Sequence, residues 1–313
     1  MTSVQRIGVI DIGTNSVLLT IAEKRDASWQ ALTEEAHITR IGEGLGRNPA
    51  FLPEAMARTS EVLKRYQQSC TEASVDQIIA VGTAAFRRAH NAKDFVAQIE
   101  TELGLTIEII SGEREAELSF LAAAKDFGED LLVVDIGGGS TEYIWKQGET
   151  VKGISLPLGS VVMHERHVHS DPISVSDYVM LEAQILTELT QVYGSQWGGG
   201  GAALAGDVPE QLVALAGTAT TLAAMKLDLE TYSHAEVHGT KLRDKELLDL
   251  LKRLRDATVE ERKQARGLEP ARADVILEGT LILQQTMDLF GYDEVTISDR
   301  GVRWGLIYEQ LSA

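Results

Sequence analysis

The chain is poor in cysteine and has no segment suited to spanning a membrane. Its 313 residues include one cysteine, Cys70, so an internal disulfide is excluded and a reducing, cytoplasmic location is expected. Cys70 ends an amphipathic segment with no adjacent base, which predicts a buried thiol rather than a nucleophile. No apolar run approaches the roughly 20 residues that span a bilayer. Strand-like sequence begins by Ile7, which leaves no room for a signal peptide.

Basic residues are also scarce. There are 29 Lys and Arg against 47 Asp and Glu, a formal net charge of −18 at pH 7. Because nucleic-acid binding needs a basic face that releases counterions, a nucleic-acid partner is not expected. The same charge repels a polyanionic substrate, which would need a metal ion and a local arginine cluster. The length allows two domains, each with its own core. The oligomeric state is left open, with a homodimer as one option.

Several catalytic signatures are missing. No Walker A sequence occurs, and the glycine-rich stretch at residues 198–201 lacks the lysine of one, so we expect a surface loop there. His164, His167 and His169 lie close together, but their spacing is not that of a zinc-protease helix. They are expected to be surface or lightly buried residues. The absence of a His-Asp dipeptide argues against an HD-type metal phosphohydrolase domain.

Two short segments are near-copies of one another. Ile-Asp-Ile-Gly-Thr-Asn-Ser at residues 10–16 recurs as Val-Asp-Ile-Gly-Gly-Gly-Ser-Thr at residues 134–141. Each lies between two apolar runs, a pattern that predicts strand, tight turn and strand. Glycines allow such a turn to bring backbone N–H groups close to an anion, and hydroxyls add donors. The aspartates, Asp11 and Asp135, can hold a divalent cation or orient a water molecule. Two copies indicate a duplicated phosphate-handling device.

The duplication continues along both halves. A third strand is expected to end at an aliphatic-Gly pair, at residues 41–42 and 158–159. An apolar run then closes on Gly-Thr-Ala, at residues 82–84 and 217–219, and opens a helix. Each half finishes with strand, serine and helix. The sequence therefore predicts two related α/β domains with a cleft between them. The first covers 1–124 and is completed by a C-terminal helix at about 300–313. The second covers 125–299, with a helical insert at about 233–290.

Two further helices have clear beginnings. Pro53 and Glu54 suit the first turn of a helix that runs to about Cys70. Ser174 through Asp177 fits a capping box, which predicts a helix to about Tyr193.

Acidic residues after residue 111 give the first candidates for catalysis. Three glutamates crowd one helical start, and the simplest explanation is complementation of the helix dipole. At 100° per residue, however, Glu115 lies at the edge of the apolar stripe, whereas Glu113 and Glu117 lie opposite. Glu115 is therefore the candidate general base. In the second half, Glu142 follows the glycine turn and could position Mg²⁺ or water together with Asp135.

Arginines near the expected strand ends could supply the missing positive charge. Arg87 lies one turn into the helix that follows Gly82, where its guanidinium could clamp a phosphate. A solvated surface arginine is the alternative. Arg40, Arg300 and Arg303 flank other strand ends and could contribute to the same field.

Taken together, these residues resemble the exopolyphosphatase / guanosine pentaphosphate phosphohydrolase family, within the actin-like (ASKHA, ribonuclease H-like) superfamily of duplicated α/β folds. The similarity covers almost the whole chain, and its more specific part is residues 135–142 beside Glu115 and Ala116. The resemblance implies a catalytic base at Glu115, Mg²⁺ or Mn²⁺ held by Asp11, Asp135 and Glu142, and a phosphate held by Arg87. It also implies a phosphate path lined by Asn15, Ser16, Gly137, Gly138, Gly139, Ser140, Thr141, Thr218 and Arg300.

The implied reaction is hydrolysis of the terminal phosphate of inorganic polyphosphate. Longer members of the family carry an HD-like domain after the second half, and this sequence ends without one. Shorter polyphosphates or guanosine pentaphosphate therefore become credible substrates. The alternative functions are a kinase that transfers the γ-phosphate of ATP, for which no acceptor motif is evident, and a non-catalytic sensor of polyphosphate or alarmone.

Overall fold

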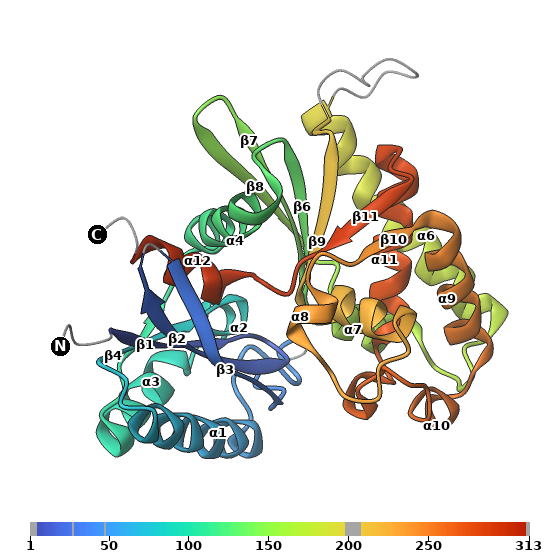
Figure 1. Ribbon diagram of the computed structural model, residues 1–313. Helices are drawn as coiled ribbons and strands as arrows, with labels where there is room; N and C mark the ends of the chain where they lie inside the picture. The colour runs from blue at the N-terminus through green and yellow to red at the C-terminus, as the bar shows by residue number, and fades with distance from the viewer. Residues whose placement is uncertain (1–4, 27, 47, 198–207, 311–313) are drawn as a thin grey trace. The chain divides into compact units, whose positions relative to one another are not determined.

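The computed structural model describes residues 5–310, except 27, 47 and 198–207 (Figure 1). The expected glycine-rich loop at 198–201 lies outside the described residues. The chain divides into two compact units. Unit 1 comprises residues 1–122 and 302–313, and unit 2 comprises residues 123–301. The division falls inside helix α4 (Gly112–Phe127).

Unit 1 is built on a five-stranded sheet in the order β3-β2-β1-β4-β5. Its strands are β1 (Arg6–Ile12), β2 (Ser16–Arg25), β3 (Ser28–Ile38), β4 (Gln77–Gly82) and β5 (Ile107–Ile109). The first three strands are antiparallel neighbours, whereas β4 and β5 run parallel to β1. Parallel strands need a crossover, and helices provide it here.

Helices cover both faces of the unit 1 sheet, because alternate residues of β1 are buried on opposite sides. Ile10 and Ile12 pack with α1 (Pro53–Glu72), α2 (Ala84–Arg88) and α3 (Ala92–Leu103). Ile7 and Val9 pack on the other face with the first part of α4 and with α12 (Val302–Glu309). Both ends of the chain therefore contribute to this unit (Figure 1).

The prediction that the thiol of Cys70 is buried is confirmed, and burial raises its pKa to about 11. Across the described ranges, each helix is too short or too polar to cross a bilayer.

Unit 2 repeats the same sheet and adds one strand. The order is β10-β11-β9-β6-β7-β8, and its first five positions from β8 match unit 1 in order and direction. The strands are β6 (Leu131–Ile136), β7 (Thr141–Gln147), β8 (Thr150–Leu156), β9 (Gln211–Leu215), β10 (Lys241–Arg243) and β11 (Glu294–Ile297). The predicted duplication is thus confirmed at the level of strand order.

The helices of unit 2 form a thick apolar layer with one face of this sheet. They are α5 (Ser160–His167), α6 (Val175–Trp197), α7 (Ala216–Lys226), α8 (His234–Val237), α9 (Asp244–Asp256), α10 (Val259–Arg262), a 3₁₀ turn (Pro270–Arg272) and α11 (Ile276–Phe290). The insert expected to be helical over 233–290 also contains β10, which pairs antiparallel with β11.

Three expected element boundaries were wrong. Strands β3 and β8 end before the aliphatic-Gly pairs, because Gly42 and Gly159 pack against the glycine turns. Helix α7 begins at Ala216, so Gly-Thr-Ala lies within its first turn. Ser174 accepts a hydrogen bond from the Asp177 N–H, but the reciprocal half of the capping box is missing. The Ser174 N–H instead donates to Ser170 Oγ. The expected cleft between the domains stays a prediction.

Candidate functional site

The glycine turn of unit 1 joins β1 to β2 and is closed by a short hydrogen bond. The Gly13 N–H donates to the Ser16 carbonyl at 3.0 Å, and the Gly42 N–H donates to the Thr14 carbonyl at 2.9 Å. A Cβ at position 42 would lie 2.3 Å from the Thr14 side chain, so only glycine allows this approach. Among the described residues, the N–H groups of Thr14 and Asn15 donate to no protein acceptor. They could therefore donate to an anion, and the phosphate-binding role expected of this turn stays a prediction.

Asp11 stands at the end of β1, just before this turn. It is on the same face of the strand as Ile7 and Val9, the face that α4 and α12 cover. Its Oδ1 atom is buried and, within the described part of the chain, has no hydrogen-bond partner. Burial, and to a smaller extent the Glu115 carboxylate, raise the pKa of Asp11 to about 7 against the opposing effect of Arg303. An orphaned carboxylate oxygen of this kind fits a hard cation such as Mg²⁺.

Glu115 and Arg87 meet in unit 1. The Arg87 Nη1 atom lies 2.7 Å from Glu115 Oε2 and also donates to the Ile110 carbonyl at 3.1 Å. The Glu115 side chain is 15% exposed and that of Arg87 is 28% exposed. Burial raises the pKa of Glu115 above its usual range, although the guanidinium lowers it in part. The proposed base and the proposed phosphate clamp are therefore bound to each other.

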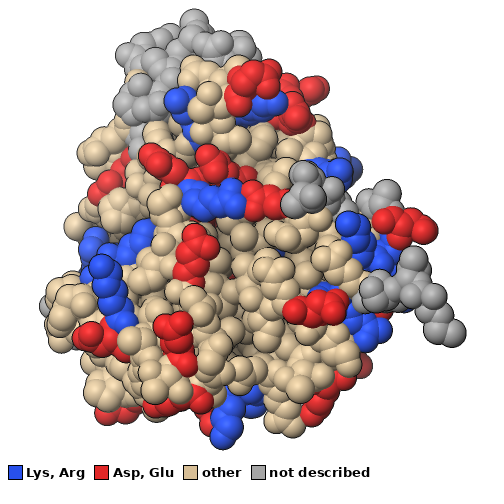
Figure 2. Space-filling view, turned by 90° about the vertical axis from the view of Figure 1, so that its left-hand side faces the viewer, with Lys and Arg blue, Asp and Glu red and all other residues tan. Residues whose placement is uncertain are grey.

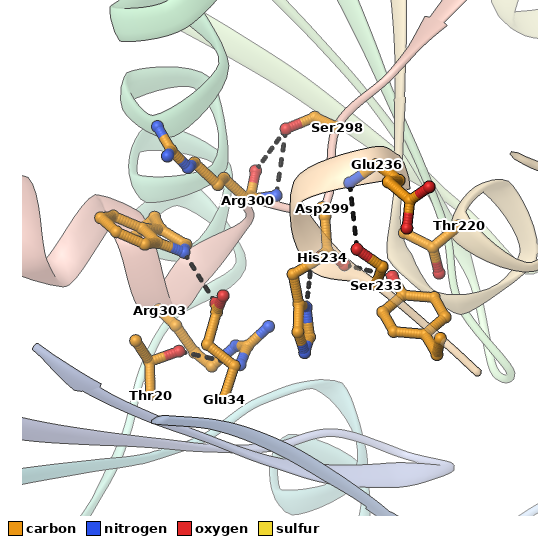
Figure 3. Close-up of polar contacts among 12 residues, drawn as sticks. Thr20, Glu34, Thr220, Ser233, His234, Glu236, Ser298, Asp299, Arg300 and Arg303 are labelled. Atoms are coloured by element: carbon orange, nitrogen blue, oxygen red, sulfur yellow. Dashed lines mark hydrogen bonds and ion pairs between the residues drawn. The ribbon is translucent and has the colours of Figure 1, made fainter. Parts of the chain in front are cut away.

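The other arginines have structural partners, a result the sequence did not predict. Arg303 is buried and donates to the Leu19 carbonyl and to Thr20 Oγ1, at 3.1 and 2.8 Å (Figure 3). It braces α12 against β2, and its charge also acts to lower the pKa of Asp11. Arg40 has a positive φ of 51°, unusual for a residue with a side chain, just after the last residue of β3.

The glycine turn of unit 2 reproduces that of unit 1. The Gly137 N–H donates to the Ser140 carbonyl at 3.0 Å. Helix α5 begins against this turn, because the Ser160 and Val161 N–H groups donate to the carbonyls of Gly137 and Gly138, each at 3.0 Å. Within the described ranges, the N–H groups of Gly138, Gly139 and Ser140 donate to no protein acceptor. Thr141, by contrast, is buried and gives its hydroxyl proton to the Leu158 carbonyl.

Asp135 and Glu142 face each other across this hairpin. They are register partners on the antiparallel strands β6 and β7, so their side chains lie on the same face. Glu142 Oε1 accepts hydrogen bonds from the Ser140 and Ser155 hydroxyls, at 2.7 and 2.6 Å. Two oxygen ligands from neighbouring strands suit a divalent cation.

Thr218 lies in the first turn of α7, in tight contact with other elements. A Cβ at Gly279 of α11 would lie 2.4 Å from Thr218 Oγ1. One at Gly217 would lie 2.1 Å from the Arg272 guanidinium, so Arg272 packs directly over this turn. Ala216 has a positive φ of 66°, a strained backbone that commonly marks functional sites. Sequence reasoning named Thr218 but gave no role to Arg272, since no local signal places it there.

Arg300 and its neighbours form a polar cluster at the end of β11. Arg300 Nη1 lies 2.9 and 3.0 Å from the two carboxylate oxygens of Asp126. Its N–H and carbonyl both bond to Ser298 Oγ, and His234 Nδ1 pairs with Asp299 (Figure 3). A phosphate at Arg300 would therefore compete with Asp126.

Charge on the visible surface is mixed rather than segregated. In Figure 2, blue Lys and Arg side chains are interspersed with red Asp and Glu side chains. The basic face that nucleic-acid binding needs is not seen on this side.

Comparison with known proteins gives a match over nearly the whole chain. The model of the Ppx/GppA phosphatase family matches residues 20–313. "Exopolyphosphatase 2" of Mycobacterium tuberculosis is 31% identical, over 96% of this chain and 97% of that protein. A "Guanosine-5'-triphosphate,3'-diphosphate pyrophosphatase" of Vibrio cholerae is 29% identical over 96% of this chain, but over 58% of its own length. The crystal structure of the Aquifex aeolicus member of the Ppx/GppA family has a TM-score of 0.81 at 32% identity, covering 99% of this chain and 98% of that one. The expected fold of two duplicated actin-like (ASKHA) α/β domains is thereby confirmed.

Proposed function

Because the chain belongs to the Ppx/GppA phosphatase family of phosphoanhydride hydrolases, we propose that it removes the terminal phosphate of inorganic polyphosphate by attack of water. The observation that carries the proposal is the half-buried Glu115, whose pKa is raised by burial. A carboxylate with a raised pKa is a better general base near neutral pH than an ordinary one. Glu115 is the one partly buried glutamate at the start of α4, since Glu113 and Glu117 are exposed.

In this reaction Glu115 accepts a proton from the attacking water, and Arg87 holds the phosphate. Arg87 is bound to Glu115 before substrate arrives. A phosphate that takes over the guanidinium leaves the carboxylate free to act as a base. One contact thus couples substrate binding to activation of the base.

Each glycine turn, taken within its own unit, supplies further donors for phosphate oxygens. Thr14 and Asn15 in unit 1, and Gly138 to Ser140 in unit 2, offer N–H groups without protein acceptors in the described ranges. Such groups stabilise the negative charge that spreads over phosphate oxygens during transfer. Asn15, Ser16 and Thr218 add polar side chains beside these turns, and Arg300 adds a cation that Asp126 already binds.

Phosphatases of this family generally depend on a divalent metal. In unit 1 the carboxylate that fits such an ion is Asp11, with its orphaned buried oxygen, and in unit 2 it is the facing pair Asp135 and Glu142. A bound Mg²⁺ or Mn²⁺ would neutralise charge on the phosphate oxygens. It would also offset the net charge of −18 that repels the substrate.

We propose polyphosphate as the substrate ahead of guanosine pentaphosphate because of how much of each relative the chain covers. It spans 97% of the protein named an exopolyphosphatase, but 58% of the protein named for the guanosine substrate. Hydrolysis of guanosine pentaphosphate to the tetraphosphate is the second candidate, since the same groups could act on its 5′-triphosphate. A cytoplasmic location is proposed from Cys70, a free buried thiol.

The test is phosphate release from polyphosphates of graded length, with guanosine pentaphosphate in parallel and with or without Mg²⁺. The Glu115→Gln variant should have a kcat about 10²- to 10⁴-fold lower, since that is the typical contribution of a general base. It should still bind substrate. Glu113→Gln is the matched control, because that exposed glutamate lies on the same helix.

Near-normal turnover by Glu115→Gln would exclude this residue as the base. Binding without turnover in the unaltered enzyme would favour a sensor. Phosphate loss from ATP that depends on an added acceptor would favour a kinase.

A further inference from the structure

A buried carboxylate in unit 2 has no part in the chemistry described so far. Glu278 lies in the first turn of α11 and is 0% exposed. Its Oε1 atom lies 2.9 Å from His164 Nδ1 of α5, and its Oε2 atom is buried without a partner in the described part of the chain. Burying a charge is costly unless it is paired, so this pair needs an explanation.

The surroundings of the pair identify His164 as the group that balances Glu278. The hydrogen bond to Glu278 raises the pKa of His164, Asp274 adds to the increase, and Arg262 of α10 opposes it. Arg262 is itself buried and donates to the Leu254 and Ala273 carbonyls, not to Glu278. The imidazolium of His164 is therefore the hydrogen-bonded counter-charge.

Solvent can reach His164 from one side. Its side chain is 28% exposed, and it lines a cavity of about 270 Å³. The loop that follows α5, together with Val259 and Arg262 of α10, forms the other walls. Protons can thus exchange with the imidazole while Glu278 stays buried.

The two helices joined by this pair each support a phosphate-binding turn. Helix α5 donates its first N–H groups to the carbonyls of Gly137 and Gly138. Helix α11 presents Gly279, the neighbour of Glu278, against Thr218, with no room for a Cβ. A shift of α5 relative to α11 would therefore change the distance between the glycine turn and Thr218.

We propose that His164 and Glu278 are positioning residues, whose pair fixes the spacing between the Gly137–Ser140 turn and Thr218 and so sets the affinity for a chain of phosphates. This inference rests on the proposed function, in which both turns bind substrate. Neither residue touches the reacting phosphate, so the pair affects KM and leaves kcat nearly unchanged.

The experiment compares KM and kcat for tripolyphosphate between pH 6 and 9 in the full-length protein. Glu278→Gln removes the charge and keeps the shape of the side chain. Its KM should exceed that of the unaltered protein by about tenfold at pH 6.5, the effect of losing one charged hydrogen bond. The pair exists while His164 is protonated and is lost as pH rises through its raised pKa. The KM ratio should therefore fall toward one at pH 9, and ionisation of the substrate cancels in the ratio.

Three further variants complete the experiment. His164→Asn keeps a neutral donor near the Nδ1 position and should show an intermediate KM with little pH dependence. His169→Asn is the matched control, since that histidine lines the same cavity but is 67% exposed, and it should behave as the unaltered protein. If Glu278→Gln fails to fold, the double variant His164→Leu, Glu278→Leu is measured in its place. It replaces the pair with apolar side chains, a change that proteins commonly tolerate at buried ion pairs.

A KM ratio within twofold of one at all pH values, in either Glu278→Gln or the double variant, would overturn the proposal. So would a loss confined to kcat. Failure of the proposed function is distinguishable, because the unaltered protein would then release no phosphate from tripolyphosphate.

Discussion

At the scale of single residues, the proposed function gives Arg87 two partners in turn. Bound to Glu115, it stabilises the ionised carboxylate, and in the proposed reaction it transfers to a phosphate. The predicted helix position of Arg87 proved correct, but its contact with Glu115 could not be predicted. The two residues are separated by 28 positions, and their meeting depends on how α2 and α4 pack on the sheet.

Replacing Arg87 should weaken substrate binding in a salt-dependent way. For Arg87→Ala we expect KM to rise by about tenfold at low ionic strength, because a charged hydrogen bond is lost. The increase should shrink in high salt, which screens the charge. Steady-state kinetics at increasing NaCl concentration measure it, with exposed Arg88→Ala as the control. A KM ratio that does not change with salt would contradict this role.

Asp11 should make stability depend on pH. Its folded-state pKa of about 7 exceeds 3.8, the ordinary pKa of an aspartate. Stability from this group is therefore complete below the lower value and is lost as pH rises through about 7. The shift corresponds to at most about 4 kcal/mol.

Asp11→Asn removes this pH-dependent loss. Without metal, the melting temperature of the variant minus that of the unaltered protein should increase as pH rises from 4 to 8. Calorimetry over this range measures the difference. Mg²⁺ at pH 8 should stabilise the unaltered protein more than the variant, since a carboxylate binds the ion more strongly than a neutral amide does. If the melting temperatures of the two proteins change with pH in parallel, a raised pKa of Asp11 is excluded.

At the scale of elements, the glycine turns and their strands were predictable because their signals are local. Apolar runs on either side of a glycine turn identify β1, β2, β6 and β7. The three-residue strand β10 was missed, since Lys-Leu-Arg carries too little pattern to reveal a strand. The contacts of Gly159, Gly217 and Gly279 were hidden for another reason. They depend on elements far apart in the chain that approach without side chains between them.

Gly159 offers a direct test of how α5 supports the phosphate turn. A Cβ at this position would lie 2.1 Å from the Gly138 carbonyl oxygen, so Gly159→Ala must displace the turn or the helix. We expect a loss of about 1–3 kcal/mol in the free energy of unfolding, as for other overpacked sites, together with a raised KM. Urea unfolding and phosphate release measure the two effects.

Gly148→Ala serves as the control for Gly159→Ala. Gly148 lies between β7 and β8 with a positive φ of 62°, and a Cβ there would meet nothing within 4 Å. That variant should lose only the local backbone preference, about 1 kcal/mol, with normal kinetics. Equal losses of activity in both variants would show that crowding at Gly159 is unimportant.

At the scale of the whole molecule, two separate cores predict unfolding in two steps. The apolar clusters of unit 1 and unit 2 share no residues, so each unit can lose its structure separately. Trp29 and Trp304 report on unit 1, whereas Trp145 reports on unit 2. Urea unfolding of a variant with Trp145 and Trp197 changed to Phe should show one fluorescence transition, and calorimetry should show two.

A single calorimetric peak that coincides with the fluorescence transition would instead show that the units unfold together. In that case the stability changes described for Asp11 and Gly159 would apply to the whole chain and not to one unit.

The course of the chain also bears on how the protein is made. Helix α12, at residues 302–309, lies against β1 and supplies Trp304 and Ile307 to the apolar cluster that contains Ile7 and Val9. A ribosome synthesises β1 about 300 residues before it synthesises α12. Unit 1 therefore cannot be finished before α12 has been made, and until then its early strands stay exposed to chaperones or to mispairing.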